Sequence, residues 1–218
     1  MFYMEGYYMK KYSAIIYDLD GTLLDTVEMN MKTLQKIIEE ETGVLWPYEE
    51  VLQFVPYAGM KVMSILEFNN PKQVYQRWVK YVNNYHGGAK AFEGVDDLLS
   101  QMDGKIIQAV VSSKTREQYQ IDIVTKDWDK YFSTTVLAGD TKLHKPNPEP
   151  LLLCIKQLGI KKEEAIYIGD SLLDYHCCQS AGVDFGYAAW GSIDNQGINN
   201  PKVIFSRPQD IINFIFPK

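Results

Sequence analysis

Short apolar runs alternate along this chain with longer stretches whose apolar residues recur at helical spacing. The runs that predict strands are 13–17 (SAIIY), 106–111 (IIQAVV), 134–137 (TTVL), 165–168 (AIYI) and 183–188 (VDFGYA). Strands that alternate with crossover helices are typical of a parallel sheet. The pattern therefore predicts an α/β fold.

The segment between the first two predicted strands is far longer than one crossover requires. Its periodicity predicts helices over 27–42, 48–53, 59–66 and 71–85. Gly43 stands where the first would stop, and Gly87 and Gly88 follow the last. The simplest account is an all-helical cap domain inserted into an α/β core, with one more helix over 95–102 returning the chain to the sheet. The predicted boundaries are 9–25 and 91–218 for the core, 26–90 for the cap and 1–8 for an N-terminal tail.

Polar residues directly follow three of the predicted strands. They are Asp18, Ser112 and Asp170, the last after an intervening glycine. In open parallel sheets, ligands bind beyond the carboxyl ends of the strands. We therefore expect these three side chains to meet in one crevice.

The first of these segments places two carboxylates close together, in Asp18-Leu19-Asp20-Gly21-Thr22. Like charges at this distance repel and raise one pKa unless a cation lies between them. Mg²⁺ prefers hard oxygen ligands and would resolve the conflict. An Asx-type turn that closes the strand is the alternative for the segment taken alone.

The segment after the second strand is Ser112-Ser113-Lys114. The Ser112 hydroxyl can donate to a phosphate oxygen beside the backbone N–H groups that follow, so we expect Ser113 and Lys114 to bind substrate too. A helix N-cap is the common alternative role for such a serine. Lys145 lies before an apolar helix in a proline-rich turn, where a fixed cation suits phosphoryl transfer. An isolated lysine in such a turn would more commonly be a surface residue.

The last segment is Gly169-Asp170-Ser171-Leu172-Leu173-Asp174. Asp170 at the strand end can bind a metal ion. Asp174, four residues on, can share that face of the first helical turn. An acidic residue there also favours the helix dipole, so a structural role for Asp174 stays open.

Taken together and in this order, the four segments resemble the haloacid dehalogenase superfamily of phosphatases. The matching motifs are D-x-D-G-T-L, the hydroxyl at a strand end, K-P-x-P and G-D-S-x-x-D, which span the chain from Asp18 to Asp174. The resemblance implies a Rossmann-like core, an aspartyl-phosphate intermediate and a Mg²⁺ cofactor. It assigns Asp18 as the nucleophile, Asp20 as the general acid and base, Ser112 as the phosphate-binding hydroxyl and Lys145 as the charge-neutralising lysine. Expected metal ligands are Asp18, Asp20 through its backbone carbonyl, Asp170 and Asp174.

Within that superfamily, Asp20 argues against dehalogenases and phosphonate-cleaving members, which lack an aspartate there. The helical insertion resembles the cap of phosphoglycolate phosphatases, β-phosphoglucomutases and some pyrophosphatases. Mutases carry a catalytic histidine and a tryptophan where this chain has Asn30 and Leu34. We therefore expect a phosphoglycolate phosphatase-like enzyme with residues 55–61 as a candidate specificity loop. A sugar phosphate mutase and a non-enzymatic binding module are the alternatives.

Composition and charge limit the classes of partner that we expect for this protein. The 218 residues include 22 Lys and Arg against 28 Asp and Glu, a net charge of -6, and the basic residues form no stripe that predicts nucleic acid binding. No apolar run approaches the roughly 20 residues that span a bilayer, and the first residues lack a signal-peptide pattern. The 3 cysteines are odd in number, as suits free thiols in a reducing compartment. We expect a cytoplasmic monomer or homodimer whose partner is a small phosphorylated molecule.

Overall fold

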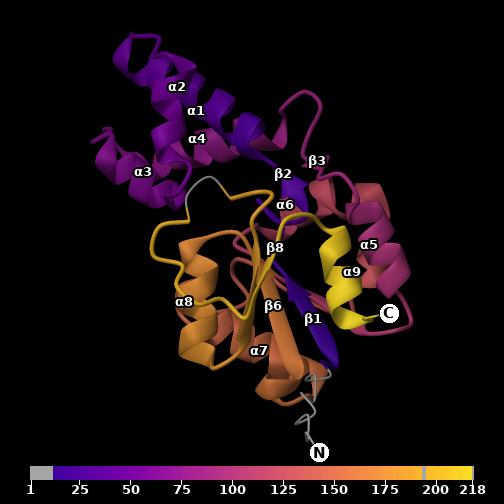
Figure 1. Cartoon of the computed structure of the whole chain (residues 1–218). Coiled ribbons are helices and arrows are strands. Elements are labelled where there is room, and N and C mark those ends of the chain that lie inside the picture. The colour runs from indigo at the N-terminus through magenta and orange to yellow at the C-terminus, as the bar shows by residue number, and fades with distance from the viewer. Residues whose placement is uncertain (1–11, 193–194, 218) are drawn as a thin grey trace, which may run out of the picture.

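The core is a parallel six-stranded sheet in the order β5-β4-β1-β6-β7-β8. The computed structural model describes residues 12–192 and 195–217 (Figure 1). The strands are β1 (Ala14–Tyr17), β4 (Ile107–Val111), β5 (Thr134–Val136), β6 (Ala165–Gly169), β7 (Asp184–Ala188) and β8 (Val203–Phe205). Tyr17, the last residue of β1, pairs with Val110 on one side and Ile168 on the other. The three strand ends predicted to carry the site are therefore neighbours, and the predicted α/β fold with a Rossmann-like sheet is confirmed.

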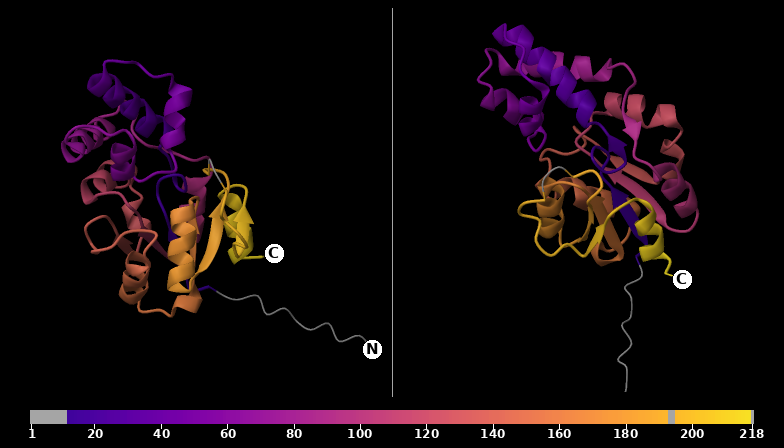
Figure 2. Two further views of the ribbon diagram at one scale, coloured as in Figure 1. Left: turned by 90° about the vertical axis from the view of Figure 1, so that its left-hand side faces the viewer. Right: turned by 45° about the horizontal axis from the view of Figure 1, so that its top comes forward.

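Helices cover both faces of this sheet. On β1, Ile15 and Tyr17 belong to the core under α5 (Val95–Met102) and α9 (Gln209–Ile215). Ile16 belongs to the core under α7 (Glu149–Leu158) and α8 (Leu172–Ala181). Figures 1 and 2 show the two helical layers on opposite sides of the strands. Burial on both faces explains why the strands read as continuous apolar runs.

Four α-helices form a separate layer beyond the carboxyl end of β1 (Figure 1). They are α1 (Val27–Thr42), α2 (Tyr48–Val51), α3 (Gly59–Ile65) and α4 (Pro71–Asn83), with a 3-10 turn over Leu52–Phe54. We call this layer the helical insert. The Trp78 indole on α4 donates to the Asn30 carbonyl (3.2 Å) and to the Thr33 hydroxyl (3.1 Å) on α1. Leu34 is fully buried within it.

A short antiparallel pair joins the helical insert to the core. It consists of β2 (Leu24–Asp25) and β3 (Lys90–Ala91), which lie on the two connecting segments. The sequence pattern did not predict this pair, because two residues carry no periodicity. The pairing holds the two connecting segments side by side.

Element boundaries agree closely with the predicted ones, with a few differences. Helix α1 ends where expected, at Gly43, whose φ of 72° lets its N–H reach the Glu39 carbonyl. Helix α4 stops at Asn83, before the predicted end at residue 85. Besides β2 and β3, the α-helices and strands that were not predicted are α6 (Arg116–Asp122), β8 and α9. They are short, and β8 and α9 follow a turn-rich segment.

Two further predictions concern membrane-spanning segments and the N-terminal tail. Within residues 12–192 and 195–217, the structure has no helix both long and apolar enough to cross a membrane. The predicted N-terminal tail, residues 1–8, lies outside the described residues.

Candidate active site

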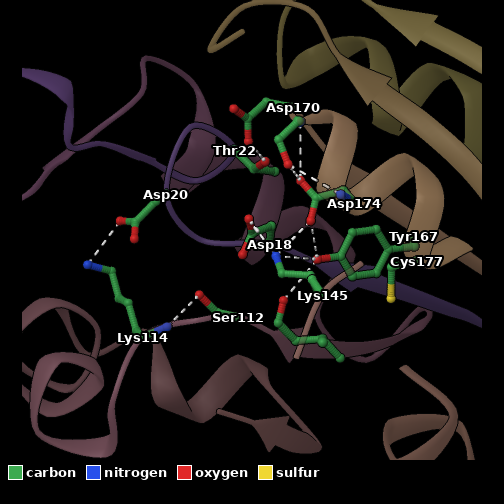
Figure 3. A network of polar contacts seen from close by, with 12 residues as sticks. Asp18, Asp20, Thr22, Ser112, Lys114, Lys145, Tyr167, Asp170, Asp174 and Cys177 are labelled. Carbon is green, nitrogen blue, oxygen red and sulfur yellow. Dashed lines mark hydrogen bonds and ion pairs between the residues drawn. The ribbon is translucent and has the colours of Figure 1, made fainter. Parts of the chain in front are cut away.

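Side chains from three strand ends and one turn meet in a network of polar contacts (Figure 3). Asp18 follows β1, Ser112 follows β4 and Asp170 follows β6. Lys145 comes from the turn that precedes α7. The parallel register delivers the first three to the same edge of the sheet, as their positions in the sequence predicted.

Asp18 is a buried carboxylate with one unsatisfied oxygen. Its Oδ2 lies 2.9 Å from the Lys145 ammonium. Its Oδ1 is buried and has no hydrogen-bond partner among the described residues. Burial raises the pKa of Asp18 to about 7, although the nearby Lys145 acts in the opposite direction. A cation in addition to Lys145 would therefore stabilise the ionised form of Asp18.

Lys145 is the fixed cation of the site. Its Nζ lies 2.6 Å from Asp174 Oδ1, 2.9 Å from Asp18 Oδ2 and 3.2 Å from the Tyr167 hydroxyl. Burial opposes the charge, but Asp174 and Asp18 outweigh it and raise the pKa of Lys145. The ammonium is therefore retained at neutral pH, and the proline-rich turn and three partners fix its position.

Asp174 is fully buried, and both of its oxygens have partners. Oδ1 accepts from Lys145 and, at 3.1 Å, from the Tyr167 hydroxyl. Oδ2 accepts from the Ser171 hydroxyl (2.6 Å) and backbone N–H (3.2 Å), which closes a capping box on α8. Asp174 thus holds Lys145 and caps its own helix at once.

Asp170 stands beside the Asp18-to-Thr22 loop. Its Oδ1 accepts a 3.0 Å hydrogen bond from the Thr22 hydroxyl. Burial raises the pKa of Asp170 well above its usual range, and the charges of Asp174 and Asp18 add to the effect. One carboxylate oxygen from each of these three aspartates lies within 4.8 Å of the others. Such a cluster of hard oxygen ligands suits Mg²⁺.

Gly21 makes room for this cluster. Its φ is 75°, in the region that favours glycine. A Cβ at this position would lie 2.2 Å from Asp170 Oδ2. The glycine of the D-x-D-G segment is therefore required both by the turn and by the close approach of the acidic loop after β6.

Asp20 and Lys114 form a second group on the other side of Asp18. The Asp20 side chain is 39% exposed, and its Oδ1 lies 2.9 Å from Lys114 Nζ. Figure 3 shows the carboxylate directed toward that lysine. Lys114 is almost fully buried and also lies 2.7 Å from Asp122 Oδ2. The predicted substrate-binding ammonium thus has two carboxylate partners within the protein.

The two remaining predicted residues, Ser112 and Ser113, differ in burial. The Ser112 hydroxyl is buried at the end of β4 and accepts from the Lys114 backbone N–H at 3.3 Å. Ser113 is exposed. The hydroxyl at 112 therefore lies inside the site, and its neighbour lies on the surface.

Three residues at the site were missed by the sequence reasoning: Thr22, Tyr167 and Asp122. The Tyr167 hydroxyl also donates to the Val111 carbonyl (2.9 Å), so it connects the end of β4 to Lys145 and Asp174. Its signal was a lone phenol inside a wholly apolar strand. Asp122 carried no signal, because it lies on the unpredicted helix α6.

The chain is similar in sequence to known proteins. Residues 15–188 match the family model described as haloacid dehalogenase-like hydrolase. The chain is 33% identical over 185 residues to the "Putative pyrophosphatase PpaX" of Caldanaerobacter subterraneus subsp. tengcongensis, covering 83% of each chain. It is 26% identical over 183 residues to the pyrophosphatase PpaX of Bacillus velezensis, covering 83% of this chain and 85% of that one.

The fold is also similar to solved structures. One is the crystal structure of a "putative phosphoglycolate phosphatase" from Lactobacillus plantarum, with a TM-score of 0.87 and 23% sequence identity. The match covers 94% of this chain and 99% of that chain. At this identity the likeness establishes the shared fold.

Proposed function

The chain belongs to the haloacid dehalogenase-like hydrolase family and is an enzyme of the phosphatase type, and we propose that it hydrolyses a small phosphorylated molecule with Mg²⁺ and with Asp18 as the nucleophile. The observation that carries this proposal is the state of Asp18. It is buried, its Oδ2 is fixed by Lys145, and its Oδ1 has no hydrogen-bond partner among the described residues. A nucleophile must be held in place and must keep an oxygen free of hydrogen bonds, and Asp18 meets both needs.

The donor set fits Mg²⁺. Asp18 has an unpartnered buried oxygen, Asp170 lies close to it, and burial raises the pKa values of both. We assign direct ligation to these two side chains and to the Asp20 backbone carbonyl. Asp174, also predicted as a ligand, supports them by holding Lys145, because both of its oxygens are hydrogen-bonded. When bound, Mg²⁺ supplies positive charge to the phosphoryl oxygens and relieves repulsion among the carboxylates.

The residues then divide the work of a two-step displacement. An Asp18 oxygen attacks phosphorus, the bond from phosphorus to the leaving oxygen breaks, and Asp20 gives that oxygen a proton. Water next attacks the phosphorus of the aspartyl phosphate and passes a proton to Asp20. Inorganic phosphate leaves with the water oxygen, and the Asp18 carboxylate is restored. Ser112 donates to a phosphoryl oxygen, and Lys145 offsets the charge between nucleophile and phosphate.

The helical insert supports a role as a cap over this site. We propose that residues 26–90 form the cap domain and residues 9–25 and 91–218 the core domain. Tyr57 and Met60, both within the predicted specificity segment 55–61, are exposed at 48% and 41%. Such side chains are free to contact a substrate when a cap closes over its site.

Two substrate classes follow from different observations. A phosphate monoester such as phosphoglycolate is the class that the motifs and the insert predict. Pyrophosphate is the second candidate, because the relative that is 33% identical carries the name pyrophosphatase. In pyrophosphate the leaving group is itself a phosphate, and the attack of Asp18 on phosphorus is unchanged.

Phosphate release from a panel of substrates tests the proposal. The panel comprises pyrophosphate, phosphoglycolate, a hexose 1-phosphate and an aryl phosphate, each with Mg²⁺ and with EDTA. We expect Mg²⁺-dependent release that falls at least about 10³-fold in Asp18→Asn, because the amide is not a nucleophile. Asp103→Asn, an exposed aspartate after α5, is the matched control and should keep full activity.

The other outcomes select the alternatives. Isomerisation of the hexose 1-phosphate without phosphate release would select the mutase. A folded protein that turns over no member of the panel with Mg²⁺ would select the binding module. An Asp18→Asn variant with most of its activity would remove the nucleophile assignment.

A further inference from the structure

Lys114 lies between two carboxylates from different parts of the chain. Its Nζ is 2.9 Å from Asp20 Oδ1 in the loop after β1 and 2.7 Å from Asp122 Oδ2 on α6. Lys114 and Asp122 are only 3% and 6% exposed at their side chains, whereas Asp20 is 39% exposed. Two buried charges thus support a carboxylate that is partly exposed, and Figure 3 shows the Lys114 ammonium facing Asp20.

The burial explains why this arrangement is fixed. Removing an ammonium from water costs several kcal/mol unless carboxylates pair with it closely. Burial opposes the charge on Lys114, but Asp20 and Asp122 outweigh it and raise its pKa. Asp122 is held by α6, whose first turn is fixed by a capping box at Thr115. The ammonium therefore has a defined place, and the Asp20 carboxylate is oriented against it.

We propose that Lys114 and Asp122 are positioning residues for Asp20, and that Lys114 acts through this carboxylate and not by binding the substrate phosphate. This inference rests on the proposed function, in which Asp20 transfers the proton. The ammonium has three N–H donors, so beyond a third contact it could bind phosphate only by leaving one of its two carboxylates. Leaving Asp122 would strand a buried charge, and leaving Asp20 would release the proton-transfer group.

The inference predicts a dependence on the leaving group. An alkyl phosphate needs a proton on its leaving oxygen, because an alkoxide is a poor leaving group. An aryl phosphate with an acidic phenol, such as p-nitrophenyl phosphate, needs little help in its first step. Misplacing Asp20 should therefore slow the first step for the alkyl ester and spare it for the aryl ester. A general loss of active-site structure would slow both.

The experiment compares wild type, Lys114→Met and Asp122→Asn on β-glycerophosphate and p-nitrophenyl phosphate, with pre-steady-state detection of the phenol. Proton transfer contributes about 10²–10⁴-fold to such reactions, so we expect Lys114→Met to lose about 10–100-fold in kcat on the alkyl ester. Asp122→Asn should lose less, in the same direction. The burst of phenol should stay within about 3-fold of wild type in rate, followed by slow turnover as the aspartyl phosphate awaits its base.

Orthovanadate inhibition separates the two roles of Lys114. If this lysine acts through Asp20, the orthovanadate inhibition constant of Lys114→Met should stay within about 3-fold of wild type. A rise of 10-fold or more in that constant would assign the ammonium to the phosphate and overturn the inference. An equal loss in the first step with both esters would also overturn it.

A double variant and a surface control separate the predicted effect from a folding defect. Lys114→Met/Asp122→Leu removes both buried charges, so no carboxylate is stranded if the single variant fails to fold, and the same leaving-group contrast is expected. Lys130→Met breaks the exposed pair with Asp127 and is the matched control without effect. If wild type releases phosphate from neither ester and from no other member of the substrate panel, the proposed function fails and the inference with it. An active wild type without the contrast defeats the inference alone.

Discussion

At the scale of single residues, Gly21 allows the acidic loops after β1 and β6 to lie close together. The loop after β1 turns at this glycine with a φ of 75°, and the Asp170 carboxylate lies against its Cα. A side chain there would meet that carboxylate before it met solvent. The residue with no side chain thus brings the carboxylates of the site into one group.

Replacing Gly21 with alanine should therefore impair metal binding beyond its cost in backbone strain. Gly104 is the matched control, because its φ is 67° and a Cβ added there would have no atom of the described residues within 4 Å. We expect both alanine variants to lose about 1–2 kcal/mol of unfolding free energy from the left-handed backbone. Only Gly21→Ala should also lose the Mg²⁺-induced rise in Tm, measured by thermal unfolding with and without the ion. An unchanged rise in Gly21→Ala would contradict this role.

At the scale of elements, two helices begin with the same kind of cap but serve different ends. Ser171 caps α8 through Asp174, and Thr115 caps α6 through Gln118, each in a reciprocal capping box. Gln118 is bonded within its own cap, whereas Asp174 also holds the Lys145 ammonium. The start of α8 therefore combines helix stability with the position of the Lys145 ammonium.

Alanine at each cap should separate these two roles. Ser171→Ala and Thr115→Ala should each lower the unfolding free energy by about 1 kcal/mol, as measured in urea. Ser171→Ala should in addition lower kcat about 5–10-fold, because a hydrogen bond to charged Asp174 contributes about 1.5 kcal/mol or more. Equal kcat values in the two variants would show that the cap does not position Asp174.

At the scale of the whole molecule, we expect the buried carboxylates to couple folding to pH and to Mg²⁺. Burial raises the pKa of Asp18 to about 7 and that of Asp170 well above its usual range. The folded protein thus binds more protons than the unfolded chain between about pH 4 and pH 7. Stability from these groups is therefore present at low pH and is lost as pH rises through the folded pKa.

Added Mg²⁺ should reverse that loss, because it binds the ionised carboxylates of the folded state. We expect the Mg²⁺-induced rise in Tm to be larger at pH 8 than at pH 5.5, and a concentration 100-fold above Kd stabilises by about 2.7 kcal/mol. Calorimetry with EDTA or Mg²⁺ at each pH measures the difference, and Asp18→Asn should reduce it. The same rise at both pH values would argue against a carboxylate metal site.

The sequence by itself determined the features that depend on local order along the chain. The apolar runs that precede Asp18, Ser112 and Asp170 predicted three strands whose ends meet in one crevice. The three strands, β1, β4 and β6, are adjacent in the sheet. Helix α1 was predicted to the residue, because its periodicity is long and its stop is a glycine. Parallel strands have their carboxyl ends at one edge, so order along the chain already implied proximity in space.

Only the tertiary structure decided which partners these side chains take. Lys114 was predicted to bind substrate, but its partners are Asp20 and Asp122, the second on a helix that no pattern indicated. Tyr167 carried no sign that its hydroxyl would reach Lys145, 22 residues away along the chain. Strand periodicity gives the face on which a residue lies, but an ion pair depends on which distant side chains the packing brings within about 3 Å.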